Sequence, residues 1–246
     1  MTPVASGRIS RRLLVILFAA LLCGALLHQK LSDGRRPRVD NRIVVCIDAG
    51  HPSECNTGMT PQHGTTETKI NWAVAQRLRA VLERDPRIRV VQPRRSMMQY
   101  MRNSRRATLA GEAGADFTVH LHCDAGPARG YTIYYPDQSA HMEGRTGPSP
   151  EVLRSSRRAA LAMKAAMASV LEGRLKNRGV RGESTTYYGS RFGGLTVSVF
   201  SECPTVTVEM VFLSNPLDAA FIKTEAGQRR MAEALARGIR EFLGVG

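Results

Sequence analysis

Residues 43–51 read Ile43-Val44-Val45-Cys46-Ile47-Asp48-Ala49-Gly50-His51. Five apolar, mostly β-branched residues in a row predict a strand that is buried on both faces of a parallel sheet. Gly50 permits a sharp turn after that strand, so His51 falls just beyond its carboxyl end. Ligands of open α/β sheets bind at this edge. The stretch therefore predicts both the first strand of the fold and the edge that carries a functional site.

Strand-like and helix-like segments alternate along the rest of the chain. Further strands are expected at 88–91, 117–122, 130–135, 195–200 and 205–210. Helices are expected at 67–84, 97–113, 151–175, 216–223 and 225–243, with loops at 52–66 and 136–150 and an irregular segment before residue 195. This alternation predicts a single α/β domain, with an about six-stranded, mostly parallel twisted sheet and helices on both faces.

The first forty residues differ from the rest and predict export. Three arginines within residues 1–12 precede an uninterrupted apolar run at 13–27, which is the layout of a secretory signal. The run at 13–27 is shorter than the about 20 residues that a membrane span needs, which favours a secretory signal. The alternative is an uncleaved anchor in the inner membrane. The expected location is the periplasm or cell envelope. The expected organisation is a signal peptide or anchor at 1–27, a basic linker at 28–41 and one folded domain at 42–246.

The chain is strongly basic, with a net charge of +14 at neutral pH. Beyond residue 40, 28 basic residues stand against 19 acidic ones, a net charge of +9. Such a charge suits a polyanion, which can be nucleic acid, a membrane surface or an acidic cell-wall polymer, and it equally suits a solvated basic face. No zinc-finger spacing, RNA-binding aromatic motif or basic-zipper heptad accompanies the charge, so nucleic acid is not expected as a partner.

The chain has five cysteines, of which Cys23 lies in the apolar N-terminal run. The other four show no CxxC spacing, which argues against a structural zinc knuckle. In an oxidising compartment they can form up to two disulfides in three connectivities, and the sequence does not choose among them. These four are Cys46, Cys55, Cys123 and Cys203. For Cys46 and Cys123, the other interpretation is that they are small core residues on strands.

Polar residues at three further places are expected near His51. Glu67 opens the first helix after the loop, and Glu209 lies in a hydrophobic strand, where a carboxylate is costly without a partner. His120 and His122 share one face of a strand, and the residues alone leave open which of them is a ligand. Two histidines and a carboxylate that hold zinc are a common catalytic arrangement. Two core histidines and an ion pair are the alternative.

Four ordered sequence blocks carry a resemblance to a known family. From about residue 42 to 244 the chain resembles the zinc-dependent N-acetylmuramoyl-L-alanine amidases of the type-3 domain, which cleave bacterial peptidoglycan. The blocks are IDAGH at 47–51, GTTETKIN at 64–71, ADFTVHLHCDA at 115–125 and VEMVFLSNP at 208–216. Arg106 and the segment 177–180 also fall where members of the family have similar residues.

The resemblance implies a role for each site residue. His51, Glu67 and His122 would bind Zn²⁺, and Glu209 would be the general base. His120 stands where the family usually has serine, so it would be a neighbour of the site and not a ligand. The implied reaction is hydrolysis of the amide bond between the lactyl group of N-acetylmuramic acid and L-alanine of the stem peptide.

Other expectations concern the surroundings of the site and the partners. Asp48 is expected to fix the turn that carries His51. Peptidoglycan is the expected partner, a protein activator is left unidentified, and the chain is expected to be a monomer. The alternatives are another zinc amidohydrolase or peptidase acting on cell-wall peptides, or a non-catalytic wall-binding regulator. One basic group is expected either to attract stem-peptide carboxylates or to be a solvated helix face: Arg94, Arg95, Arg102, Arg105 and Arg106.

Overall fold

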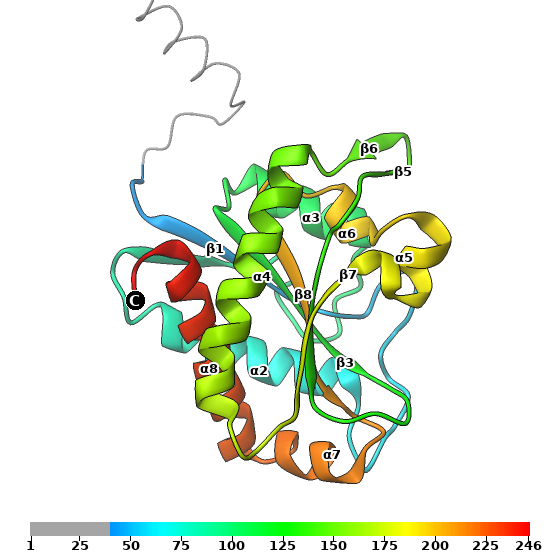
Figure 1. Cartoon of the computed structure of the whole chain (residues 1–246), viewed down its shortest axis with the longest axis vertical. Helices are drawn as coiled ribbons and strands as arrows, with labels where there is room; N and C mark the ends of the chain where they lie inside the picture. The colour runs from blue at the N-terminus through cyan, green and yellow to red at the C-terminus, as the bar shows by residue number, and fades with distance from the viewer. Residues whose placement is uncertain (1–39) are drawn as a thin grey trace, which may run out of the picture. The chain divides into compact units, whose positions relative to one another are not determined.

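The computed structural model describes residues 40–246 (Figure 1). The predicted signal or anchor at 1–27, and all but the last two residues of the predicted linker, lie outside these residues. Between residues 40 and 246, no helix combines the length and hydrophobicity that a membrane crossing requires.

The central element is a six-stranded sheet with the strand order β2-β1-β3-β8-β4-β7. Strands β2, β1, β3 and β8 are parallel, β4 is antiparallel to β8, and β7 is parallel to β4. The predicted α/β fold with a mostly parallel sheet is therefore confirmed. The strands are β1 (Ile43–Ala49), β2 (Ile88–Val91), β3 (Phe117–Asp124), β4 (Tyr131–Tyr135), β7 (Asn177–Gly182) and β8 (Thr205–Phe212).

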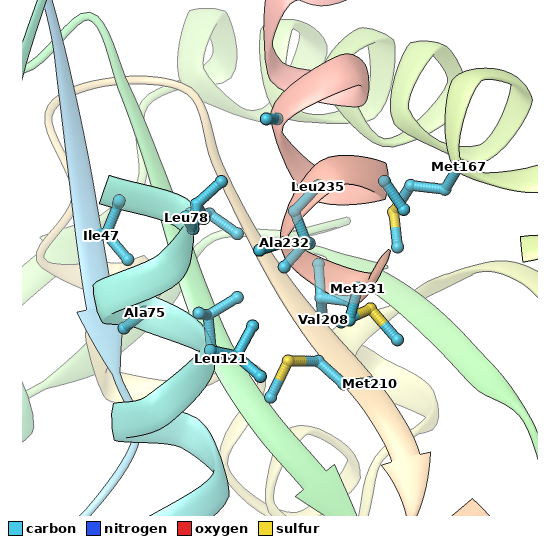
Figure 2. Packing of buried hydrophobic residues seen from close by; sticks show 14 of the residues in the cluster. Ile47, Ala75, Leu78, Leu121, Met167, Val208, Met210, Met231, Ala232 and Leu235 are labelled. Atoms are coloured by element: carbon cyan, nitrogen blue, oxygen red, sulfur yellow. The ribbon is translucent and has the colours of Figure 1, made fainter. Parts of the chain in front are cut away.

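Three long helices cover one face of the sheet, namely α2 (Glu67–Leu82), α4 (Pro150–Leu171) and α8 (Glu225–Leu243). Figure 2 shows Ile47, Leu121 and Val208 of the sheet packed in one cluster with side chains of these helices. Helices α4 and α8 approach closely at Gly238, because a Cβ there would lie 3.0 Å from Met163. Burial of this apolar face is the main source of stability for the layered arrangement.

Shorter elements occupy the opposite face and the ends of the sheet. On the opposite face, Val44 and Cys46 pack with Ala110 of α3 (Asn103–Glu112), and α3 contacts α6 (Thr196–Val199). The remaining elements are the hairpin of β5 (Ala140–Met142) and β6 (Arg145–Gly147), the 3₁₀ turn η1 (Glu183–Thr185), α5 (Tyr187–Phe192) and α7 (Pro216–Ile222). All four cysteines beyond residue 40 are free thiols, and only Cys55 is exposed.

The strand register brings distant parts of the chain together at one edge of the sheet. Asp48 of β1 is paired with His120 of β3, and His122 of β3 is paired with Glu209 of β8. Paired residues point to the same face of a sheet. The carboxyl ends of β1, β3 and β8 therefore bring together the polar residues that the sequence scatters.

Four predictions of local structure were wrong. The helix predicted at 97–113 begins only at Asn103, because Arg94 binds the carbonyls of Ser96 and Met97 and the carboxylate of Glu54 accepts the Asn103 backbone N–H. The predicted loop at 136–150 contains the β5–β6 hairpin, and the predicted irregular segment contains the edge strand β7.

The strand predicted at 195–200 is instead the short helix α6. Its β-branched residues favour a strand, but the fully buried carboxylate of Glu183 draws the segment into a turn. Oε1 of Glu183 accepts the Ser198 hydroxyl at 2.6 Å, and Oε2 accepts the Leu195 N–H at 3.3 Å. Burial raises the pKa of Glu183 to about 7, against the lowering effect of these hydrogen bonds.

Stability is expected to depend on pH through Glu183. Its folded-state pKa lies above the unfolded value, so its contribution to stability is complete below the unfolded pKa and is lost as the pH rises through about 7. Between about pH 5 and pH 8, wild type should lose about 2–3 kcal/mol of unfolding free energy relative to Glu183→Gln. Urea unfolding of both proteins measures this difference. Glu233→Gln, at an exposed position of α8, should follow wild type. Parallel curves for wild type and Glu183→Gln would contradict the prediction.

Candidate metal centre

Three side chains from separate elements converge at the carboxyl edge of the sheet. His51 follows β1, Glu67 is the first residue of α2, and His122 lies near the end of β3. Oε2 of Glu67 is 3.2 Å from Nε2 of His51, and Oε1 is 2.9 Å from Nδ1 of His122. One ligand atom from each residue lies within 4.8 Å of the others. The structure thus brings together the three residues that the family resemblance implied as ligands, in an arrangement that can hold a metal ion.

The start of α2 determines the position of Glu67. Thr66 is the N-cap, and its side chain accepts the Lys69 N–H. Glu67 lies in the first turn, where a negative charge interacts favourably with the helix dipole. Its Oε1 also accepts the Cys123 backbone N–H at 3.1 Å and the Asn71 side-chain amide at 3.3 Å. Both α2 and β3 therefore hold this carboxylate in place.

The ring of His51 is oriented by its own loop. Its Nδ1 lies 3.0 Å from the Asn56 carbonyl oxygen, and because a carbonyl only accepts, Nδ1 is the donor. In the neutral ring the lone pair is then on Nε2, which faces Oε2 of Glu67 at 3.2 Å. Two acceptors at this separation need a proton or a cation between them. The donor set therefore fits a metal ion.

Hydrogen bonds and burial shape the charge of the triad. Burial alone would raise the pKa of Glu67, but the neighbouring His122 and His51 outweigh it and hold this pKa well below its usual value. Burial lowers the pKa of His122, which favours the neutral ring that a metal requires. Gly50 leaves room for that ring, because a Cβ at Gly50 would lie 2.4 Å from it.

Glu209 provides a second carboxyl group beside the triad. Its Oε2 is buried and has no hydrogen-bond partner among the described residues. Burial, together with the charges of Glu67 and Asp124, raises the pKa of Glu209 well above its usual value. Buried polar atoms normally have partners, and a strongly shifted pKa beside other titratable groups is typical of a functional site. Glu209 is thus placed to accept and release a proton next to the triad.

A family model described as N-acetylmuramoyl-L-alanine amidase matches residues 45–241, a span that includes His51, Glu67, His122 and Glu209. The chain belongs to this amidase family. An N-acetylmuramoyl-L-alanine amidase of Mycobacterium tuberculosis is 26% identical over 195 residues, which cover 76% of this amidase and 73% of the relative. An uncharacterised protein of Bacillus subtilis is 28% identical over 224 residues, which cover 90% and 94%.

Solved structures show the same fold. An N-acetylmuramyl-L-alanine amidase of Mycobacterium smegmatis superimposes with a TM-score of 0.68 at 22% identity, covering 84% of this amidase and 100% of that chain. The catalytic domain of an amidase of Bacillus (Paenibacillus) polymyxa gives a TM-score of 0.66 at 24% identity, covering 83% and 99%.

The amidase keeps His120 apart from the triad. His120 is 1% exposed, and both of its ring nitrogens are engaged. Nδ1 lies 3.0 Å from Oδ2 of Asp48, and Nε2 lies 3.0 Å from Oγ1 of Thr205. No ring nitrogen of His120 is left to bind a metal.

The predicted basic surface of the amidase is wrong for two of its five members. Arg94 and Arg106 are only 3% and 1% exposed, whereas Arg102 and Arg105 pair with glutamates at the surface and Arg95 is exposed. The sequence did contain a signal that Arg94 lies near the site, because this residue follows β2 at the edge of the sheet where His51 lies.

Sequence reasoning also missed Asn71, whose side chain donates to Glu67. The available signal was its spacing of four residues from Glu67, which puts both on one helix face.

Proposed function

We propose that this amidase is a zinc hydrolase that cleaves the amide bond between the lactyl group of N-acetylmuramic acid and L-alanine of the peptidoglycan stem peptide. The observation that carries the proposal is the convergence of His51, Glu67 and His122 beside the carboxyl of Glu209, whose buried Oε2 has no hydrogen-bond partner among the described residues. Two imidazoles and one carboxylate are a typical donor set of catalytic zinc, with a further position open for water or substrate.

In this proposal the chain's own residues have separate tasks. His51, Glu67 and His122 would hold the ion, which when bound lowers the pKa of water and polarises a carbonyl group. Glu209 accepts the proton of the attacking water and then delivers it to the leaving amine of L-alanine. Burial and the charges of Glu67 and Asp124 raise the pKa of Glu209, which makes its carboxylate a stronger base for this water. The water attacks directly, so no covalent enzyme intermediate is needed.

The bond that is cut is the most informative observable. Zinc-loaded protein of residues 41–246 should release from purified sacculi peptides that begin with L-alanine and leave glycan strands without peptide, as read by mass spectrometry. Glycan strands that keep L-alanine would support the alternative of a cell-wall peptidase. Unchanged sacculi in the presence of zinc-loaded protein would support the alternative of a non-catalytic regulator.

We also propose that the apolar run at 13–27 exports the amidase to the periplasm or cell envelope, as a cleaved signal or an inner-membrane anchor. The basic start and the apolar run support export, as does a substrate that lies outside the cytoplasm. A protein activator is not identified, and the chain is proposed to act as a monomer.

A further inference from the structure

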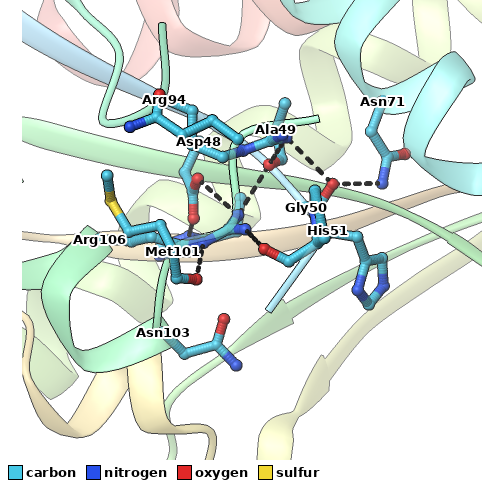
Figure 3. Close-up of polar contacts among 12 residues, drawn as sticks. Asp48, Ala49, Gly50, His51, Asn71, Arg94, Met101, Asn103 and Arg106 are labelled. Atoms are coloured by element: carbon cyan, nitrogen blue, oxygen red, sulfur yellow. Dashed lines mark hydrogen bonds and ion pairs between the residues drawn. The ribbon is translucent and has the colours of Figure 1, made fainter. Parts of the chain in front are cut away.

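Four buried polar residues beside the metal centre have no task in the proposed reaction. Asp48, Arg94, Arg106 and His120 are each no more than 3% exposed. Burying a charge is costly unless it is paired and fully hydrogen-bonded. Figure 3 shows the two guanidinium groups gathered around the backbone that follows β1. Their hydrogen bonds account for this burial.

Arg106 spans the turn that carries His51. Its Nη1 donates to Oδ1 of Asp48 at 3.0 Å and to the Ala49 carbonyl at 2.8 Å. Its Nη2 donates to the Pro52 carbonyl at 2.7 Å, and its Nε donates to the Met101 carbonyl at 3.1 Å. One planar guanidinium thus holds backbone carbonyls on both sides of His51.

Arg94 holds the same turn from a second direction. Its Nη2 donates to the Ala49 carbonyl at 2.6 Å and to the Gly50 carbonyl at 3.3 Å. Its guanidinium lies 5.4 Å from the ring centroid of Trp72, a cation–π contact. Together the two arginines satisfy the carbonyls of three of the four residues from Ala49 to Pro52. Only the His51 carbonyl lacks such a contact.

The turn needs this support because its conformation is unfavourable. His51 has a φ of 57°, in the left-handed region that side chains other than glycine seldom adopt. The ladder with β3 ends where the Gly50 N–H donates to the Leu121 carbonyl. Such backbone persists only where its surroundings hold it. Here Arg94 and Arg106 provide this support.

We infer that Asp48 and Arg106, assisted by Arg94, are positioning residues that hold the His51 turn in its metal-binding conformation before the ion arrives. The inference rests on the proposed metal-dependent function. A ligand that is already in position loses less entropy on binding. Asp48, Arg94 and Arg106, called the clamp below, therefore raise metal affinity without touching the metal. The expected size resembles that of other outer partners of metal ligands, about 10- to 100-fold in affinity.

Asp48 is itself held from both sides. Its Oδ1 accepts from Arg106, while its Oδ2 is bound by His120, whose other nitrogen contacts Thr205 of β8. Burial alone would raise the pKa of Asp48, but Arg106 and His120 lower it to about 2. Asp48 is therefore charged at neutral pH, and three adjacent strands contribute to the position of Arg106.

The test compares zinc affinity with the stability of the metal-free protein. In the full-length chain, Arg106→Lys keeps the charge but loses the planar fork, and Asp48→Asn keeps the shape but loses the charge. Zn²⁺ affinity is measured by competition with a chromophoric chelator, below the unfolding temperature of each metal-free variant. We expect both variants to bind Zn²⁺ about 10- to 100-fold more weakly and to change the visible spectrum of the Co²⁺-loaded protein. Arg105→Lys, the exposed neighbour on α3, should match wild type.

Each outcome decides the matter. A merely structural clamp would lower the unfolding temperature of metal-free Arg106→Lys and leave its Zn²⁺ affinity and Co²⁺ spectrum unchanged, which would overturn the inference. If Arg106→Lys fails to fold, Arg94→Lys removes two clamp bonds without disturbing Asp48, and wild-type affinity there would also overturn it. Wild type that binds Zn²⁺ no better than Glu67→Ala would instead refute the proposed function.

Discussion

Replacing Glu209 by glutamine is expected to lower kcat by about 10²- to 10⁴-fold, the usual contribution of general acid–base catalysis. Glutamine has nearly the same shape but cannot accept the proton of the attacking water. The loss should fall on turnover and not on metal binding, because Glu209 is not one of the three converging metal-binding groups. Release of peptides from sacculi measures activity, and the zinc content of the purified protein measures metal binding.

A matched control for this variant lies on the same strand. Thr207 is two residues before Glu209 on β8, and its buried Oγ1 also lacks a hydrogen-bond partner among the described residues. Thr207→Val keeps the shape and removes only the hydroxyl, so it should fold and turn over like wild type. Wild-type turnover by zinc-loaded Glu209→Gln would exclude Glu209 as the base.

Replacing Glu67 by alanine is expected to weaken zinc binding by more than about 100-fold, beyond the loss typical of an outer partner. Glu67 lies within hydrogen-bonding distance of both site histidines, and it also accepts from Cys123 and Asn71. Its removal deletes the one negative ligand and the group that orients the two rings. Activity should be lost together with the metal.

Thermal unfolding with and without zinc measures this loss. Free zinc at about 1,000 times its Kd stabilises a protein by about 4 kcal/mol, so wild type should unfold at a higher temperature when zinc is present and Glu67→Ala should not. Glu83→Ala, just after the other end of α2, keeps the metal-binding groups and should respond like wild type. A zinc-dependent shift of normal size in Glu67→Ala would remove Glu67 from the ligand set.

Hydrophobic pattern was sufficient for most of the fold. The strand at 88–91 has the predicted bounds, and the predicted 216–223 and 225–243 helices differ from α7 and α8 by at most one residue. These segments have a clear apolar period and a capping residue, such as Asn215 before α7 and Thr224 before α8. Their structure is therefore determined by residues that are close in the sequence.

Segments that depend on distant contacts were not predictable in the same way. The apolar residues at 195–200 read as a strand, but a buried carboxylate twelve residues earlier bends them into α6. Strand β7 carries two glycines and two arginines, so its pattern is weak, and pairing with β4 at the sheet edge creates it. In both cases the structure of the segment depends on residues that are distant in the sequence, so its own residues do not reveal it.

The sequence by itself determined the residue types of the site and the edge of the sheet where they lie. Strand alternation placed His120 and His122 on one face, and the family resemblance implied that only His122 is a ligand. The tertiary structure supplies the physical reason, since Asp48 and Thr205 engage both nitrogens of His120 while Glu67 contacts His122. Only the tertiary structure showed that Arg94 and Arg106 are buried around the turn that carries His51. The physical reason is that apolar periodicity reports which face is buried, whereas a charge is buried only where partners from other parts of the chain meet it.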